Sequence, residues 1–205
     1  MTRFATRAPK QQRSQATRRR LLDAAVDELL AEGYGGLTTS GVALRAGVSR
    51  GAAQHHFPDK ATLVSEAVRH LADLQLEELQ AGAGRSGRGR ARVEHALELI
   101  YAQYGGELFT AIVELALAAR HDEELHAVVT DAEREISRAM HAAADQIVGE
   151  DVAGRPGFAE RWAMALSTVR GLAMLSLLGH PARSVERQWR ATRPELVQLV
   201  LGGSK

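Results

Sequence analysis

The residues of this chain that could do chemistry gather around a short Ala-Gly-Val-Ser segment. Gly47 allows the chain to reverse between two short helices, and the small side chain of Ala43 lets these helices pack closely. Such a helix-turn-helix presents the start of its second helix to the major groove of DNA, which is wide enough to admit a helix. Arg50 lies at that start, and its planar guanidinium can engage the O6 and N7 atoms of one guanine. The segment therefore predicts nucleic-acid recognition.

Other spacings resemble catalytic or metal-binding motifs but lack the surroundings that the chemistry needs. The glycine spacing from Gly82 to Gly87 follows a predicted helix rather than a strand, so it indicates a connector rather than a nucleotide site. Glu123 and His126 match half of a helical di-iron site, and the second half is absent from the sequence. The sequence also has no cysteine, which excludes thiol catalysis and Cys-ligated metal sites. We therefore expect no enzyme activity, no cofactor and no metal site. The competing hypothesis, from a different functional class, is an all-helical metal enzyme.

The charge of the chain is uneven along its length. Of the 205 residues, the first 60 carry ten Lys or Arg and five Asp or Glu, and the remainder carries sixteen and twenty. A basic N-terminal quarter favours a surface that faces nucleic acid, although basic segments also serve solubility. No apolar run approaches the roughly 20 residues that span a bilayer. The first 20 residues lack the apolar stretch of a secretory signal, so we expect a cytoplasmic protein without membrane contact.

Hydrophobic side chains recur at helical spacing along most of the chain, and no segment alternates as a strand does. This pattern predicts an all-α protein of about nine helices. The predicted helices span residues 17–32, 39–46, 50–56, 59–80, 93–104, 107–119, 122–148, 158–178 and 183–201. Ser49, Asp59 and Asp122 are predicted N-caps, and a break or kink is expected at Pro194. Residues 1–15 predict a flexible basic arm, and the glycine-rich residues 82–90 predict a linker.

Residues 18–65 resemble the DNA-binding domain of the TetR (tetracycline-repressor-type) transcriptional regulators. The matching elements are Leu21-Leu22-Asp23-Ala24-Ala25, Gly33-Tyr34, Leu37-Thr38-Thr39, Ala46-Gly47-Val48-Ser49-Arg50-Gly51 and His55-His56-Phe57-Pro58-Asp59-Lys60. The chain departs from the family where Gln54 replaces the usual tyrosine and where Gly41 interrupts a helix. The resemblance implies a helix-turn-helix domain over residues 16–62 and a helical domain for effector binding and dimerisation over residues 63–205.

The resemblance also implies which residues contact DNA. Those opening the second helix, lying on the recognition helix or starting the next helix are Thr39, Ser40, Arg50, Gly51, Ala52, Gln54, His55, His56 and Lys60. Arginines of the arm and the first helix (Arg13, Arg18, Arg19 and Arg20) are expected to contact phosphates or a minor groove. Such contacts add affinity and salt dependence more than sequence preference.

A small-molecule pocket and a homodimer are further implications of the family. The candidate pocket residues are Tyr101, Tyr104, Phe109, Ile112, Glu114, Trp162, Arg170 and Met174. Core packing is the alternative for the apolar ones. Glu114 and Arg170 interrupt apolar runs, and they would pair with each other, bind a ligand or face solvent between subunits. Residues 158–178 are apolar on nearly all sides, which favours a helix shared between core and interface. The residues expected to be shared are Trp162, Leu166, Val169, Leu172, Leu175 and Leu178.

These features predict a sequence-specific, dimeric DNA-binding regulator, expected to be a repressor that a small molecule releases from a palindromic operator. The ligand would favour a conformation in which the helix after Asp59 has swung, and this changes the spacing of the two recognition helices. The alternative is a DNA-binding protein without a small-molecule effector, controlled by a partner protein or acting architecturally.

Overall fold

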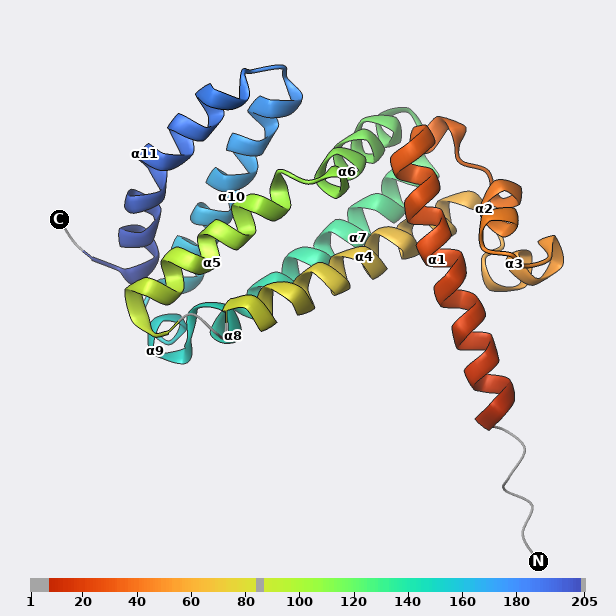
Figure 1. The fold of residues 1–205 in the computed structure, drawn as a ribbon, viewed down its shortest axis with the longest axis horizontal. Helices are drawn as coiled ribbons and strands as arrows, with labels where there is room; N and C mark the ends of the chain where they lie inside the picture. Colours follow the sequence, from red (N-terminus) through yellow and green to blue (C-terminus); the bar gives the residue numbers. More distant parts are fainter. Residues whose placement is uncertain (1–7, 84–86, 204–205) are drawn as a thin grey trace, which may run out of the picture. The chain divides into compact units, whose positions relative to one another are not determined.

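The computed structural model of the chain describes residues 8–83 and 87–203 (Figure 1). Within these ranges it has eleven α-helices, one short 3₁₀ helix and no strand, which confirms the all-α prediction. Contacts divide the chain into two compact units. The first unit has the described residues up to Leu71 together with Ala111–Glu133, and the second has Ala72–Thr110 and the described residues from Arg134 onward.

The first unit is built on a long N-terminal helix and two short ones. These are α1 (Ala8–Gly36), α2 (Thr39–Arg45) and α3 (Arg50–His56), joined by the beginning of α4 (Lys60–Ala83). The C-terminal part of α6 (Glu107–Ala118), the 3₁₀ helix η1 (Ala119–His121) and the beginning of α7 (Glu123–Ala142) also belong to this unit. Side chains of three helices and one loop form the core between them: Leu21, Ala25, Leu29, Val42, Ala43, Phe57 and Val64.

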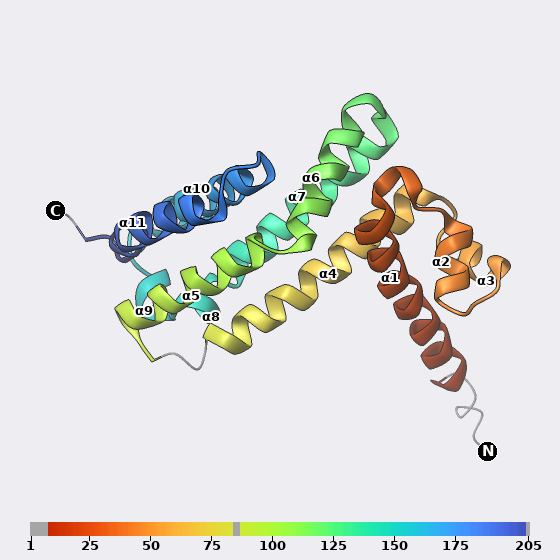
Figure 2. The same cartoon turned by 45° about the horizontal axis from the view of Figure 1, so that its top comes forward.

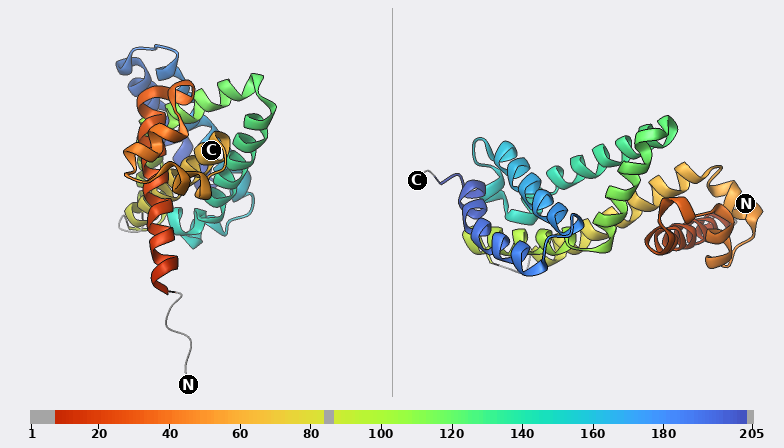
Figure 3. Two further views of the ribbon diagram at one scale, coloured as in Figure 1. Left: turned by 90° about the vertical axis from the view of Figure 1, so that its right-hand side faces the viewer. Right: turned by 90° about the horizontal axis from the view of Figure 1, so that it is seen from above.

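The prediction of a flexible arm over residues 1–15 is partly wrong. Helix α1 begins at Ala8, so residues 8–15 are helical. Pro9 is tolerated there, since the first turn of a helix has no backbone partner for its N–H groups. The following Gln, Arg and Ala residues have good helix propensity. The N-terminal turns of α1 extend past α2 and α3 (Figures 1 and 3). The part of the arm before residue 8 lies outside the described residues.

Three predicted N-caps are confirmed by hydrogen bonds from backbone N–H groups. The Ala52 N–H donates to Ser49 Oγ over 3.2 Å, and the Leu125 N–H donates to Asp122 Oδ1 over 2.9 Å. The Thr62 N–H donates to Asp59 Oδ1 over 2.7 Å, which fixes the start of α4. Each cap satisfies a donor that the helix itself leaves unpaired.

Two glycines turn the chain as expected. Gly33 has φ 64° and ψ 179°, a combination open only to glycine, and it ends the regular part of α1. Gly47, with φ +63°, makes the turn between α2 and α3. The short helix α2 can therefore reverse into α3 without strain.

The second unit packs its last two helices against α5. It contains the C-terminal parts of α4 and α7, and α5 (Gly89–Tyr104), α8 (Ala144–Val148), α9 (Glu150–Ala153), α10 (Phe158–Leu177) and α11 (Ala182–Leu201). Helix α10 lies against both α11 and α5 (Figure 2). Buried side chains from these helices and α8 form its core: Val93, Leu97, Ile100, Ile147, Trp162, Val169, Trp189, Val197 and Val200.

Several helices of this unit differ from the sequence prediction: α5 begins at Gly89 rather than at residue 93, within the expected linker, and α9 was not predicted. The single helix expected over residues 122–148 is interrupted at Ala143, and α8 is a separate short helix. Arg92 holds that short helix by donating from Nε to the Ile147 carbonyl over 3.1 Å. The break expected at Pro194 is wrong, because α11 runs through it from Ala182 to Leu201. Burial of one apolar stripe on both sides of the proline outweighs the one backbone hydrogen bond that it removes.

Candidate nucleic-acid interface and small-molecule site

The outward face of α3 carries the residues expected to read DNA. Arg50, Gly51, Gln54 and His55 are exposed, and Ala52 and His56 are half-buried. Ala53 and Phe57 are buried, 6% and 3% exposed, and they anchor the helix on α1 and α2. The predicted contact residues of α3 are thus brought to one open side of the first unit by the burial of the opposite side.

The residues at the start of α2 lie beside this face. Thr39 and Ser40 are half-buried in the first turn, and Thr38 caps the helix by accepting the Gly41 N–H over 3.0 Å. Ser40 Oγ accepts two hydrogen bonds from Arg50, from Nε over 2.9 Å and from Nη2 over 2.6 Å. Two residues that the sequence assigns separately to DNA are therefore bonded to each other across the helix-turn-helix.

Lys60 is positioned by an aromatic ring that the sequence analysis did not assign a role. Its Nζ lies 4.2 Å from the centroid of the Tyr34 ring, an attractive cation–π arrangement. Burial lowers the pKa of Lys60. Burial raises the pKa of Tyr34, and the carboxylates of Asp122, Glu124 and Asp59 raise it further. Tyr34 thereby holds the first residue of α4 against the end of α1.

Two of the four arginines expected to contact phosphates are bonded within the chain. Arg20 donates to the Ala46 carbonyl from Nε over 3.1 Å and from Nη2 over 2.6 Å, and to the Gly47 carbonyl over 2.9 Å. Arg18 pairs with Glu66 over 2.5 Å, and its guanidinium lies 5.5 Å from the Phe57 ring centroid. These two residues fasten α1 to the helix-turn-helix and to α4.

The other two arginines, Arg13 and Arg19, are exposed on α1. The sequence alone could not distinguish the arginines that are bonded within the chain, Arg18 and Arg20, from Arg13 and Arg19. An arginine can serve either to bond within the chain or to contact phosphates.

The histidines at the end of α3 contact each other. The His55 and His56 rings meet edge to face with centroids 5.7 Å apart. Burial lowers the pKa of His56, and the nearby His55 and Arg18 lower it further. A neutral imidazole at this position can both donate and accept a hydrogen bond.

Several candidate ligand residues of the second unit take part in aromatic pairs. Tyr101 stacks on Trp189 with centroids 4.3 Å apart, and Tyr104 meets Phe109 edge to face at 5.2 Å. Trp162 is fully buried against Phe158. Its position fits the core packing that the sequence analysis left open.

Glu114 and Arg170 are both exposed in the single chain. Arg170 donates from Nη2 to the Tyr104 hydroxyl over 3.3 Å, in the second unit. Glu114 belongs to the first unit, with Oε2 near Gly33. The remaining two candidates, Ile112 and Met174, are half-buried.

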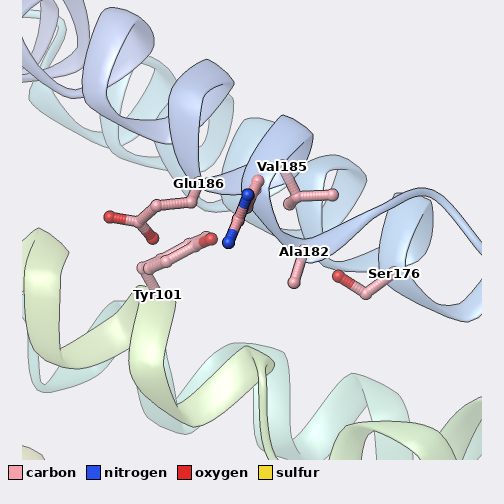
Figure 4. Close-up of a pocket in the computed structure, with 6 residues that line it drawn as sticks. Tyr101, Ser176, Ala182, Val185 and Glu186 are labelled. Carbon is pink, nitrogen blue, oxygen red and sulfur yellow. The ribbon is translucent and has the colours of Figure 1, made fainter.

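A shallow pocket of about 370 Å³ opens on the second unit (Figure 4). It is lined by Tyr101 of α5, Ser176 of α10, and Ala182, Arg183, Val185 and Glu186 of α11. Tyr101 is the only one of its lining residues that the sequence analysis assigned to a pocket. Arg183 and Glu186 were missed because charged residues at the beginning of α11 resemble an ordinary solvated helix end.

The apolar side chains of α10, and of Leu178 directly after it, differ in exposure. Trp162, Leu166, Val169 and Leu172 are buried within the chain, whereas Met164 and Leu178 are 57% and 70% exposed. Of the residues expected to be shared between core and interface, some are therefore buried within the chain and others are left exposed.

Comparison with known proteins places the first unit in a sequence family. Residues 21–67 match the model of bacterial regulatory proteins of the tetR family. An HTH-type transcriptional regulator from Mycobacterium tuberculosis, Rv2912c, is 28% identical over 69% of this chain and 73% of its own length. The regulator CymR of Pseudomonas putida is 26% identical over 91% of this chain and 92% of its own.

Solved structures share the fold over most of the chain. A TetR-family transcriptional regulator from Mesorhizobium loti has a TM-score of 0.69 at 19% identity, covering 93% of this chain and 97% of its own. The multidrug binding protein EbrR complexed with proflavin has a TM-score of 0.58 at 22% identity, covering 89% and 99%. A transcriptional regulator from Saccharomonospora viridis in complex with choline has a TM-score of 0.61 at 21% identity, covering 89% and 94%.

Proposed function

Because this chain belongs to the TetR family of bacterial transcriptional regulators, we propose that it is a repressor that binds a palindromic operator as a homodimer. A small molecule would release it from that operator. Family membership makes the chain a DNA-binding transcriptional regulator and not an enzyme. No helix in the described part of the chain could cross a membrane. The proposed place of action is the cytoplasm, where bacterial DNA lies.

The exposed face of α3 is the observation that carries this proposal. Arg50, Gln54 and His55 stand open on a short helix whose other side is buried by Ala53 and Phe57. A guanidinium suits guanine and an amide suits adenine, so this face carries groups that distinguish bases. Arg13 and Arg19 on the extended α1 supply positive charge for the phosphate backbone.

Dimerisation is proposed through the open face of α10. Leu178 and Met164 leave an apolar surface that one chain does not cover. Two copies of α3 related by a two-fold axis would require half-sites a multiple of roughly 34–36 Å apart on one side of the duplex. This arrangement supports a palindromic operator.

The effector response is supported by the ligands of two structural relatives. Proflavin in EbrR and choline in the Saccharomonospora viridis protein are small organic cations. The second unit of this chain offers a half-buried aromatic ring, that of Tyr101, beside the carboxylate of Glu186 in the pocket of Figure 4. Aromatic faces and carboxylates attract organic cations.

Helices α4, α6 and α7 have residues in both units, so each forms a continuous connection between them. A ligand that favours one orientation of α4 would shift the spacing of the two recognition helices.

A reporter assay tests repression and release together. An operator selected by the purified protein is placed between a promoter and a reporter gene in a bacterial host, with and without this chain. Repression predicts lower expression with the chain, and a library of small organic cations is then screened for compounds that restore it. An Arg50→Ala variant, which should not repress, controls for effects unrelated to DNA binding.

Each outcome of this assay separates the hypotheses. Higher expression in the presence of the chain would make it an activator. Repression that no compound relieves would favour the alternative, a DNA-binding protein controlled by a partner protein or acting architecturally. Relief by a compound that leaves operator affinity unchanged in a purified titration would contradict release by ligand.

A further inference from the structure

We propose that Ser40 is a positioning residue that sets the base preference of Arg50, rather than an independent phosphate contact. This inference rests on the proposed DNA-binding function and goes beyond it, because it assigns a base-specific effect to a residue on α2. The carrying observation is the pair of hydrogen bonds that join Ser40 to Arg50 across the helix-turn-helix.

The geometry of these bonds determines which edge of the guanidinium stays open. Nε and Nη2 of Arg50 both donate to the single oxygen of Ser40, over 2.9 Å and 2.6 Å. These two N–H groups form the side-on edge of the guanidinium. Of its five N–H groups, three then remain, two on Nη1 and one on Nη2. Within the described part of the chain, no other hydrogen bond of Arg50 is found.

The open edge has the shape that a guanine needs. One N–H of Nη1 and the remaining N–H of Nη2 point in parallel from the end of the guanidinium. A parallel pair of donors matches the O6 and N7 acceptors of guanine in the major groove. An unbraced arginine could instead turn its side-on edge to the base or swing to a phosphate. Ser40 therefore favours end-on reading of one base.

The bracing also lowers the entropic cost of binding. Arg50 is exposed, and a free arginine side chain loses substantial rotamer freedom when a complex orders it. Two bonds to Ser40 restrict this freedom before DNA arrives. Ser40 is half-buried at the beginning of α2, so its own position is fixed by the helix. Its hydroxyl hydrogen is still able to donate, so the brace does not use up its capacity for hydrogen bonding.

The test measures base preference at single positions of the operator. The full-length chain selects a duplex from a random pool, and all single-base variants of that duplex are then titrated by fluorescence anisotropy. The proteins compared are the natural chain, Ser40→Ala, Ser40→Thr, Arg50→Ala and the Ser40→Ala/Arg50→Ala double variant. Thermal unfolding of each variant checks that it is folded, and Ser40→Cys replaces Ser40→Ala if the alanine variant does not fold.

The expected result is position-specific. Arg50→Ala identifies one base pair, a G·C pair, at which preference is lost. Ser40→Ala lowers the preference at that same pair on the order of fivefold and leaves the other positions unchanged. Ser40→Thr keeps the hydroxyl and restores the preference. The double variant matches Arg50→Ala, because the brace has no effect without the guanidinium.

Three results would overturn the inference. The first is a loss of affinity for Ser40→Ala that is equal for all duplexes, as a phosphate contact predicts. The second is a change at a base pair other than the one that Arg50 reads, and the third is an unchanged preference profile. Failure of the natural chain to enrich any duplex would count against the proposed function itself, so the two failures are distinguishable.

Discussion

At the scale of single residues, Arg20 shows how a charge expected to face DNA instead supports the helix-turn-helix. We expect Arg20→Gln to lower the free energy of unfolding by about 1 kcal/mol, because it removes bonds to two carbonyls at the α2–α3 turn. The variant should also bind the operator more weakly. Urea denaturation and anisotropy measure the two effects.

Arg19→Gln is the matched control, since Arg19 is exposed on the same helix. It should keep the stability of the natural chain, weaken DNA binding about equally for all sequences and reduce the salt dependence of that binding. Equal stability of both variants would show that the bonds of Arg20 contribute nothing to the fold.

His56 predicts a dependence of stability on pH. Its pKa is lowered in the folded chain, chiefly by burial, so the unfolded chain binds the proton more readily. The stability contributed by neutral His56 is therefore full above the ordinary histidine pKa of about 6.5 and is lost as pH falls through the folded value. We expect His56→Gln to flatten the unfolding free energy in that window below about pH 6.5. Denaturation of both proteins at several pH values measures the difference, and parallel curves would contradict the assignment.

Much of the candidate nucleic-acid interface could be predicted residue by residue from the sequence. What could not be predicted was missed for a physical reason. The turn at Gly47 and the caps Ser49 and Asp59 follow from local chemistry, which the sequence displays directly. The bonds of Arg20 and Ser40 join residues that are distant along the chain. Their partners become visible only once the helices are packed.

At the scale of elements, the end of α1 depends on one glycine. We expect Gly33→Ala to lower the free energy of unfolding by about 1–3 kcal/mol, because φ 64° with ψ 179° strains any other residue. Gly35→Ala is the control: its added methyl group meets no atom within 4 Å, and its φ is not in the left-handed region. Chemical denaturation of the two variants measures the difference. An equal effect of both substitutions would contradict a special role for Gly33.

The helix boundaries show where the residue pattern of the sequence no longer predicts the structure. Pro194 predicts a break by its local chemistry, and α11 nevertheless continues because Trp189 and Val197 are buried on either side of it. Ala143, with high helix propensity, lies at an interruption that its own chemistry does not indicate. In both places packing against other helices overrides the local preference, and the sequence does not display that packing.

At the scale of the whole molecule, dimerisation is expected to depend on the open face of α10. Leu178→Glu places a charge on a side chain that is 70% exposed in one chain, and we expect it to shift the protein to a monomer with much weaker operator binding. Sedimentation velocity measures the oligomeric state. Leu117→Glu on α6 is the control, because Leu117 is also largely exposed, at 56%. A dimer that survives Leu178→Glu unchanged would place the interface elsewhere.

The family match of residues 21–67 and the all-α class could both be predicted from sequence, because the helix-turn-helix residues lie within one stretch of the chain. Which residues of α10 lie in the core and which lie on the open surface could not be predicted from sequence. Leu172 on α10 and Leu178, the residue that follows the helix, are the same residue type, one 8% exposed and the other 70%. Their difference comes from how α5 and α11 cover the helix.

Selection of duplexes from a random pool by the purified chain tests the central claim most directly. Retained sequences are read after repeated rounds at a fixed salt concentration. The account predicts enrichment of a palindrome whose half-sites are one or more helical turns apart, since two copies of α3 must enter successive major grooves. Weak binding that depends on salt and enriches no sequence would contradict it, because that is the behaviour of a protein that contacts phosphates alone.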